Sequence, residues 1–462
     1  MIISVIFYII CILVVIIFVI KLYHHYSLRG QILRLYPRSN RVVRPTTITQ
    51  LQEIIHNASL NGKRISIKGA GRSLGGQTYT ADAIQIDMDN FNRILGMFDN
   101  TITVESGCKW KQVLDYLRPY NLSVEAMQSY SDFSVGGSLS VNCHGQDLNF
   151  NPIYYSTPSF RLLLSNNEII NVKSGDELFR LVIGGYGLFG IILDVTLTII
   201  PNSSILKEVL PMNVADYASY LKRICNSDIM FHSGRLNLTE DWKSCLVINY
   251  KYLSETPNTQ PRKQKKVLNE GFYLGLISNY SKLGALRTKK EMSHELSTDK
   301  IISRSDFLSA STASLESFIY PTANYVLQEY FIPFDHFASF VADLHSLVVK
   351  HDINLLNATF RYIKPHCTIL SYCKVPSIAI VLYIDLDKFS SVNTIKHWTQ
   401  QIISSALKHG GSYYLPYHLF ATPEQFKQAY PNYAYFIRKK RQYDPTNIFM
   451  SHLWKFMEDV ES

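Results

Sequence analysis

Three glycine-rich segments constrain the fold of this chain more than any other feature of its sequence. They are GAGRSLGG from residue 69, SVGGSLSVNCHG from residue 134 and GGYGLFGII from residue 184. Glycine permits positive φ and a close approach of the backbone, so that successive amide groups can form a concave site for an anion. Each segment alone predicts only a turn, but three in this order predict loops that share one ligand.

The first segment follows a predicted strand, as the glycines of a Rossmann fold do, but the rest of that motif is missing. Its third glycine comes one residue too late for GxGxxG, and the polar, then β-like run QTYTADAIQIDM comes next. A Rossmann unit needs a helix here, because the N-terminus of that helix faces the pyrophosphate. The sequence therefore disfavours an NAD site and favours a glycine loop that binds phosphate without a helix.

The pattern of apolar and β-branched residues predicts an α+β fold. A helix is expected over 46–57, where Thr49 precedes apolar residues at helical spacing, and another over 109–120. Strands are expected at 65–71, 83–88, 101–107, 191–200, 325–334 and 378–386.

Length and composition predict more than one domain. The chain has 462 residues, of which 47% are hydrophobic, and this exceeds what one core usually supports. Boundaries are expected after residues 20, 205 and 405. The formal net charge of +9 suggests attraction to anionic lipid, nucleic acid or a phosphorylated substrate, and charge alone does not choose among these.

The N-terminal residues 1–20 carry no charge and are almost wholly apolar. About 20 helical residues match the ~30 Å hydrocarbon layer, and the basic residues follow this run instead of preceding it. These features predict an uncleaved transmembrane helix of a single-pass membrane protein, with the catalytic body on the cytoplasmic side. A second basic stretch, 262–290, is interpreted either as a segment on a membrane surface or as a solvated loop.

The seven cysteines are odd in number, widely scattered and without CxxC pairs. This pattern predicts reduced thiols and no metal site. Cys367 and Cys373 are close enough in sequence to form a disulfide, but a pair of small buried residues is favoured. Cys143 is expected to be a buried thiol.

The motifs GxGRSxGG, SVGGxxxxxxHG and GGxGLxGII, followed late in the chain by YYLPY and YDPTNIF, resemble those of the vanillyl-alcohol-oxidase type of FAD-linked oxidoreductases. The chain is most similar to the decaprenylphosphoryl-ribose oxidase and aldonolactone oxidase branches, over residues 41–205 and 405–450. The resemblance implies a PCMH-type FAD-binding domain of two subdomains over 21–205. It also implies an α/β cap for the substrate over 206–405 and a segment over 406–462 that returns to the FAD domain.

By position, the resemblance implies that FAD is held by the glycine segments and their neighbours. The residues are Gly69, Ala70, Gly71, Arg72, Ser73, Leu74, Gly75, Gly76, Gln77, Ser134, Val135, Gly136, Gly137, His144, Gly145, Gln146, Asp147, Ile192 and Tyr414. In the aldonolactone branch a histidine at the place of Arg72 carries a covalent flavin link. Because arginine stands here, the resemblance implies non-covalent FAD.

Oxidation of an alcohol carbon needs a base near the carbon that gives hydride to flavin N5. His144, Tyr417 and His418 are the catalytic candidates, although a lone histidine is usually a core residue. In a strand, Tyr417 and His418 would point to opposite faces. The decaprenylphosphoryl-ribose branch has lysine at the place of Tyr417, so its proton-transfer scheme does not carry over. Glu329 and Arg361, on predicted cap strands, are candidates for substrate binding or form a structural ion pair.

Together these features predict an FAD-dependent oxidoreductase that acts on a hydroxyl or lactone carbon of a sugar-like substrate, either a small molecule or lipid-linked. The expected partners are this substrate and a membrane, and no nucleic acid. A reductase of a lipid or sterol double bond and a non-catalytic flavin-binding membrane protein are the alternatives. The electron acceptor, whether dioxygen, a quinone or another carrier, stays open.

Overall fold

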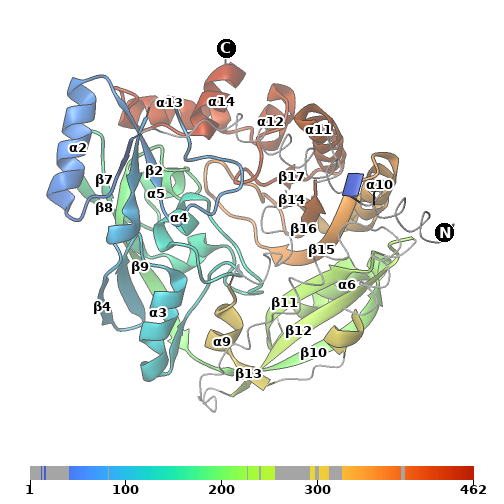
Figure 1. Ribbon diagram of the computed structural model, residues 1–462. Helices are drawn as coiled ribbons and strands as arrows, with labels where there is room; N and C mark the ends of the chain where they lie inside the picture. The colour runs from blue at the N-terminus through green and yellow to red at the C-terminus, as the bar shows by residue number, and fades with distance from the viewer. Residues whose placement is uncertain are drawn as a thin grey trace.

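The computed structural model of the chain describes residues 12, 15, 16, 41–81, 83–225, 227–238, 241–254, 292–296, 301–311, 325–386 and 391–461. Its strands form three sheets, of three, six and eight strands. The eight-stranded sheet, green to orange, lies on one side of the molecule, and the two smaller sheets lie on the other (Figure 1). The C-terminal helices lie across the top of this view.

The three-stranded sheet is parallel and leads into the first glycine segment. Its order is β1 (Arg41–Val43), β3 (Ala83–Asp87) and β2 (Arg64–Lys68). Helix α2 (Ile48–Leu60) buries Leu51 and Ile55 in the core of this sheet. The helix is capped by Thr47, whose side chain accepts a hydrogen bond from the Gln50 amide, and not by the predicted Thr49.

The six-stranded sheet is antiparallel and has β9 (Ile191–Pro201) near its centre. Along it lie β4 (Ile94–Phe98), β5 (Thr101–Glu105), β9, β7 (Ser159–Leu163) and β8 (Ile169–Lys173), while β6 (Leu122–Val124) also pairs with β9. The helices connecting these strands are η1 (Met88–Asn90), α3 (Trp110–Leu117), η2 (Arg118–Tyr120), α4 (Val135–Ser140), η3 (Ile153–Ser156) and α5 (Glu177–Val182).

The eight-stranded sheet is antiparallel throughout and contains the predicted cap strands. Its order is β13 (Ile301–Ser303), β10 (Ser204–Asn213), β12 (Ser244–Ser254), β11 (Ile229–Leu236), β15 (Asn354–Ile363), β16 (Ser377–Asp385), β14 (Tyr325–Pro333) and β17 (Ser412–Tyr413). Its helices are α6 (Val214–Ile224), α9 (Arg304–Leu308), η5 (Phe334–His336), α10 (Phe337–Lys350) and α11 (Val392–Lys408). The domain boundaries after residues 205 and 405 stay predictions.

The C-terminal segment returns to the parallel sheet, as its motif predicts. After α12 (Pro423–Ala429) and α13 (Tyr433–Tyr443), Phe449 bridges to Ile65 of β2, and α14 (His452–Glu461) ends the described chain. Asp444 shapes this return because its carboxylate accepts hydrogen bonds from the amides of Ile448 and Phe449. The same carboxylate pairs with Lys440, and both side chains are almost fully buried.

The prediction of a single-pass membrane protein is corrected by the structure. A membrane span needs about 20 apolar residues in one helix, and none of the helices in the described part of the chain is long and apolar enough. Apart from Ile12, Val15 and Ile16, the predicted anchor 1–20 lies outside the described residues, and the basic stretch 262–290 lies wholly outside them.

Six cysteines lie in the described part of the chain, and all six are free thiols. Cys373 and Cys143 are buried, as expected, but Cys367 is exposed. The prediction of two small buried residues at positions 367 and 373 is therefore wrong for Cys367.

We predict that Asp444→Ala lowers the free energy of unfolding by about 3–5 kcal/mol, because it leaves the Lys440 ammonium buried without its partner. Burial already lowers the pKa of Lys440, and the Asp444 charge opposes that shift. Urea denaturation followed by circular dichroism measures the loss. Asp335→Asn is the control, because Asp335 pairs with Lys222 on the exposed surface. Equal denaturation midpoints for both variants would contradict this account of the C-terminal return.

Candidate active site

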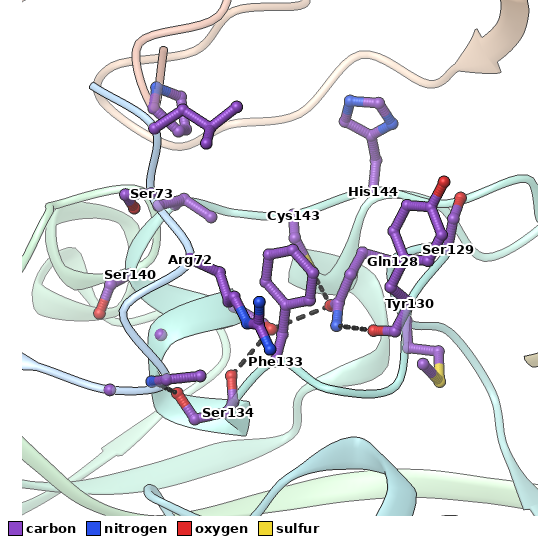
Figure 2. A pocket seen from close by; sticks show the side chains of 18 of the residues that line it. Arg72, Ser73, Gln128, Ser129, Tyr130, Phe133, Ser134, Ser140, Cys143 and His144 are labelled. Atoms are coloured by element: carbon purple, nitrogen blue, oxygen red, sulfur yellow. Dashed lines mark hydrogen bonds between the residues drawn. The ribbon is translucent and has the colours of Figure 1, made fainter. Parts of the chain in front are cut away.

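A cavity of about 480 Å³ lies where the three glycine segments, the cap sheet and the C-terminal segment meet. Figure 2 shows part of its wall, with Arg72 and Ser73 of the first segment, Ser134 and His144 of the second, and the intervening loop with Gln128, Tyr130 and Phe133. Most of the predicted site residues line this cavity: Gly69, Ala70, Gly71, Arg72, Ser73, Leu74, Gln77, Ser134, Gly136, Gly137, His144, Gln146, Ile192, Glu329, Arg361, Tyr414 and Tyr417.

The first and second glycine segments are in direct contact. The Ala70 amide donates a hydrogen bond to the Ser134 hydroxyl at 3.0 Å. A Cβ atom on Gly69 would lie 2.1 Å from that same oxygen, and one on Gly137 would lie 2.8 Å from it. A side chain at Gly69 would displace the Ser134 hydroxyl and push the two segments apart, while one at Gly137 would crowd the same hydroxyl within the second segment.

The third segment packs on helix α4 of the second. The Gly184 amide bonds to the Leu139 carbonyl at 3.0 Å, and the Tyr186 amide bonds to the Ser140 carbonyl at 2.9 Å. Tyr186 and Gly187 both have positive φ, and both line the cavity. The three segments therefore meet around one space, as their order in the sequence predicts.

The C-terminal segment is fixed to the first glycine segment through backbone contacts. The Gly75 amide donates to the Pro416 carbonyl at 3.0 Å, and a Cβ atom on Gly75 would lie 2.0 Å from the Tyr417 carbonyl oxygen. The Gln77 side-chain amide donates to the carbonyls of Leu415 and Tyr417. These contacts hold Tyr414 and Tyr417 in the cavity wall.

His144 lies against a carboxylate from the cap sheet. Its Nε2 atom is 2.9 Å from the Glu329 carboxylate, and each side chain is only 2% exposed. The Tyr417 hydroxyl donates to the other oxygen of Glu329 at 3.4 Å. His144 Nδ1 is buried and has no hydrogen-bond partner among the described residues. Glu329 therefore lies at ion-pair distance from one nitrogen of the imidazole, without the geometry of a hydrogen bond, and the other nitrogen is available.

An aromatic cage surrounds His144. The rings of Phe331, Tyr372 and Tyr414 lie with their centroids 5.5–5.9 Å from the imidazole. The hydroxyl of Tyr414 donates to the Val141 carbonyl, and that of Tyr372 to the Asn142 carbonyl. Burial raises the pKa of both phenols far above its usual range, so both stay protonated. The cage therefore fixes the short backbone segment that carries His144.

Several residues in and around the site escaped prediction because their segments carry no regular pattern. Tyr372, which packs against His144, lies in an irregular stretch after β15. Gln128 and Tyr130, which line the cavity, lie in a loop before the second glycine segment. Gln128 accepts hydrogen bonds from the Ser138 hydroxyl and from the Cys143 thiol (Figure 2). Burial raises the pKa of Cys143 to about 12, so this thiol stays protonated and unreactive at neutral pH.

The predicted residues that do not line the cavity are Gly75, Gly76, Val135, Gly145, Asp147 and His418. Asp147 pairs instead with the buried Arg304 at 2.9 Å. A Cβ atom on Gly145 would lie 2.2 Å from the Met127 carbonyl oxygen, so this glycine permits a backbone contact. Burial lowers the pKa of His418 to about 4, which keeps that imidazole neutral at neutral pH.

Of the two adjacent catalytic candidates near the C-terminus, only Tyr417 lines the cavity. The opposite orientations of Tyr417 and His418 were expected from a strand, but β17 ends at Tyr413 and these two residues lie outside it. Glu329 pairs with His144, and among the described residues no ion pair joins Glu329 to Arg361. The alternative of a structural Glu329–Arg361 ion pair is therefore wrong.

Comparison with known proteins agrees with this geometry. Residues 39–173 match the family of FAD binding domains. The chain is 30% identical over 182 residues to D-arabinono-1,4-lactone oxidase of Candida albicans, a match that covers 36% of this chain and 32% of that protein. It is 28% identical over 162 residues to L-gulono-1,4-lactone dehydrogenase of Mycobacterium tuberculosis, a match that covers 35% of this chain and 37% of that protein.

These matches span about a third of the length of the relatives. The family match, over residues 39–173, includes the parallel sheet and the first two glycine segments. Gly69 of the first segment packs against the side chain of Ser134 in the second, with no room for a side chain of its own. Residues 39–173 of this chain are an FAD-binding domain of the PCMH type, related to the aldonolactone oxidases and dehydrogenases, and its cofactor is FAD.

Proposed function

We propose that this protein is an FAD-dependent oxidoreductase that oxidises a hydroxyl-bearing carbon of a sugar lactone or a similar sugar derivative. The observation that carries the proposal is the buried contact between His144 and Glu329 in the wall of the cavity. It is supported by the FAD-binding domain and by the relatives that are named as lactone oxidases and a lactone dehydrogenase.

FAD, when bound, supplies the acceptor for the hydride that leaves the substrate carbon. The glycine segments around Gly69, Gly71 and Gly137 would hold its diphosphate through their backbone amides. Tyr414, in the cage beside His144, would lie near the flavin ring. Arg72 lines the cavity and has no nucleophilic atom for a bond to the flavin, so the FAD would be dissociable.

His144 is the proposed base. With the proton of the neutral imidazole on Nε2, which lies 2.9 Å from Glu329 Oε1, the lone pair of Nδ1 would accept the hydroxyl proton of the substrate. The imidazolium that forms is stabilised by the Glu329 charge at 2.9 Å, in a site from which water is largely excluded. Tyr417 holds Glu329 in place through its hydroxyl.

We expect His144→Ala to keep its flavin but to slow anaerobic flavin reduction by a lactone about 10²-fold or more, the usual effect of losing an acid or base. Stopped-flow absorbance at the flavin band measures the rate with D-arabinono-1,4-lactone. His56→Ala, on the exposed side of α2, is the matched control. An unchanged rate in His144→Ala would remove this residue from the mechanism. Bleaching of the wild type by NADPH alone would favour a reductase instead.

Gly71→Asp should reduce the FAD content of the purified protein at least tenfold, because it adds a carboxylate to the proposed phosphate loop. Gly62→Asp is the matched control: Gly62 has φ of 58° against 67° for Gly71, so both variants carry similar backbone strain, but Gly62 lies outside the cavity. The ratio of flavin to protein absorbance measures the content. Full occupancy in Gly71→Asp would place the diphosphate elsewhere.

Acid precipitation tests the absence of a covalent link. Because Arg72 stands where the covalent branch has histidine, the yellow colour should pass entirely into the supernatant after trichloroacetic acid treatment. Flavin fluorescence of the two fractions gives the result. A pellet that keeps the flavin would show that another side chain forms the bond.

A further inference from the structure

The cap sheet presents a set of polar side chains to the cavity. Because side chains alternate along a strand, Asn357, Thr359 and Arg361 of β15 share one face. The register of the sheet places Val381 beside Thr359 and Glu329, and Tyr383 beside Asn357. All these residues line the cavity, and Ser233 of β11 does so as well. The cap-sheet wall of the cavity therefore combines neutral polar groups with a few apolar side chains, one cation and one carboxylate.

The cation of this face, Arg361, forms no ion pair with any described residue. The Nε atom of Arg361 is buried and makes no hydrogen bond, and no carboxylate of a described residue lies within ion-pair distance of its guanidinium. Glu329 is the only carboxylate among the described residues that line the cavity, and it is held by His144 and Tyr417. Arginine does not lose its proton in proteins, so its charge stays.

A partly buried charge without a counter-charge is unfavourable, and a ligand that supplies the counter-charge recovers this cost. The planar guanidinium forms two parallel hydrogen bonds with a carboxylate or a phosphate. The other cation of the cavity, Arg72, belongs to the glycine segment proposed to hold the FAD diphosphate. Arg361 is on the opposite wall, where the substrate would lie.

We infer that the substrate oxidised in this cavity carries an anionic oxygen group, a carboxylate or a phosphate, which binds to Arg361. This inference rests on the proposed function and names the substrate class more narrowly. The oxidised carbon changes from CH–OH to C=O: its hydride reduces FAD by two electrons and its hydroxyl proton goes to His144. The anionic group is unchanged by the reaction and orients the substrate.

The test compares three probes on the holoprotein at low ionic strength: D-arabinonate, D-arabinose 5-phosphate and the uncharged D-arabinono-1,4-lactone. Changes in the flavin absorbance spectrum under anaerobic conditions give Kd for each probe. We expect at least one anionic probe to bind about tenfold or more tightly than the lactone. The better of the two anions identifies the group as a carboxylate or a phosphate.

Variants then assign the binding to Arg361. Arg361→Gln should raise Kd of the preferred anion about tenfold or more and leave Kd of the lactone within about twofold of the wild type. For Arg361→Lys we expect Kd of the anion to lie between the values of the wild type and of Arg361→Gln. Arg223→Gln, which removes the same charge from the exposed face of α6, should change neither constant. Equal binding of all three probes by the wild type, or an equal loss for all three in Arg361→Gln, would overturn the inference.

The same samples separate this inference from the proposed function. Selective anion binding through Arg361 without flavin bleaching by any of the three probes would support the anion site and contradict the proposed oxidation. Bleaching by the neutral lactone without tighter binding of either anion would support the proposed oxidation and contradict the anion site. All variants are compared at equal flavin content, so a loss of FAD is not mistaken for a loss of substrate binding.

Discussion

The contact between Gly69 and Ser134 is the constraint on which the rest of the structure depends. It joins the end of the parallel sheet to the start of helix α4, and the Ala70 amide adds a hydrogen bond to the same Ser134 hydroxyl. The space beside this contact is the cavity, and its shape follows from the absence of side chains at the glycines. The contact of Gly75 with the Tyr417 carbonyl then attaches the C-terminal segment to the same loop.

The chemistry lies between parts of the chain that are far apart in sequence. His144 comes from the segment after α4, Glu329 from the cap sheet and Tyr417 from the C-terminal segment. Their contacts are short because each part packs on the first glycine segment or on its neighbours. In the proposed mechanism the buried acid beside one imidazole nitrogen supports the base, and Arg361 on the same sheet, which forms no ion pair with a described residue, orients the substrate.

Much of the fold could be predicted from local patterns, because β-branched runs specify strands and glycines specify close approaches. The predicted strands, the α+β class and the FAD domain are confirmed. The partner of Glu329 could not be predicted, because strand register decides it and no local signal names His144. Tyr372 was missed because it lies in irregular chain, and the cap of α2 was placed at Thr49 instead of Thr47. The membrane location, which rested on the apolar length of residues 1–20 and on the basic residues that follow them, is corrected.

Hydrogen–deuterium exchange of the apoprotein with and without added FAD tests the central claim most directly. If the three glycine segments surround one cofactor, the amides of 69–77, 134–145 and 184–192 gain protection together, at the same FAD concentration. Protection of only one segment, or protection that appears at a different FAD concentration in each segment, would show that the three segments do not share a ligand.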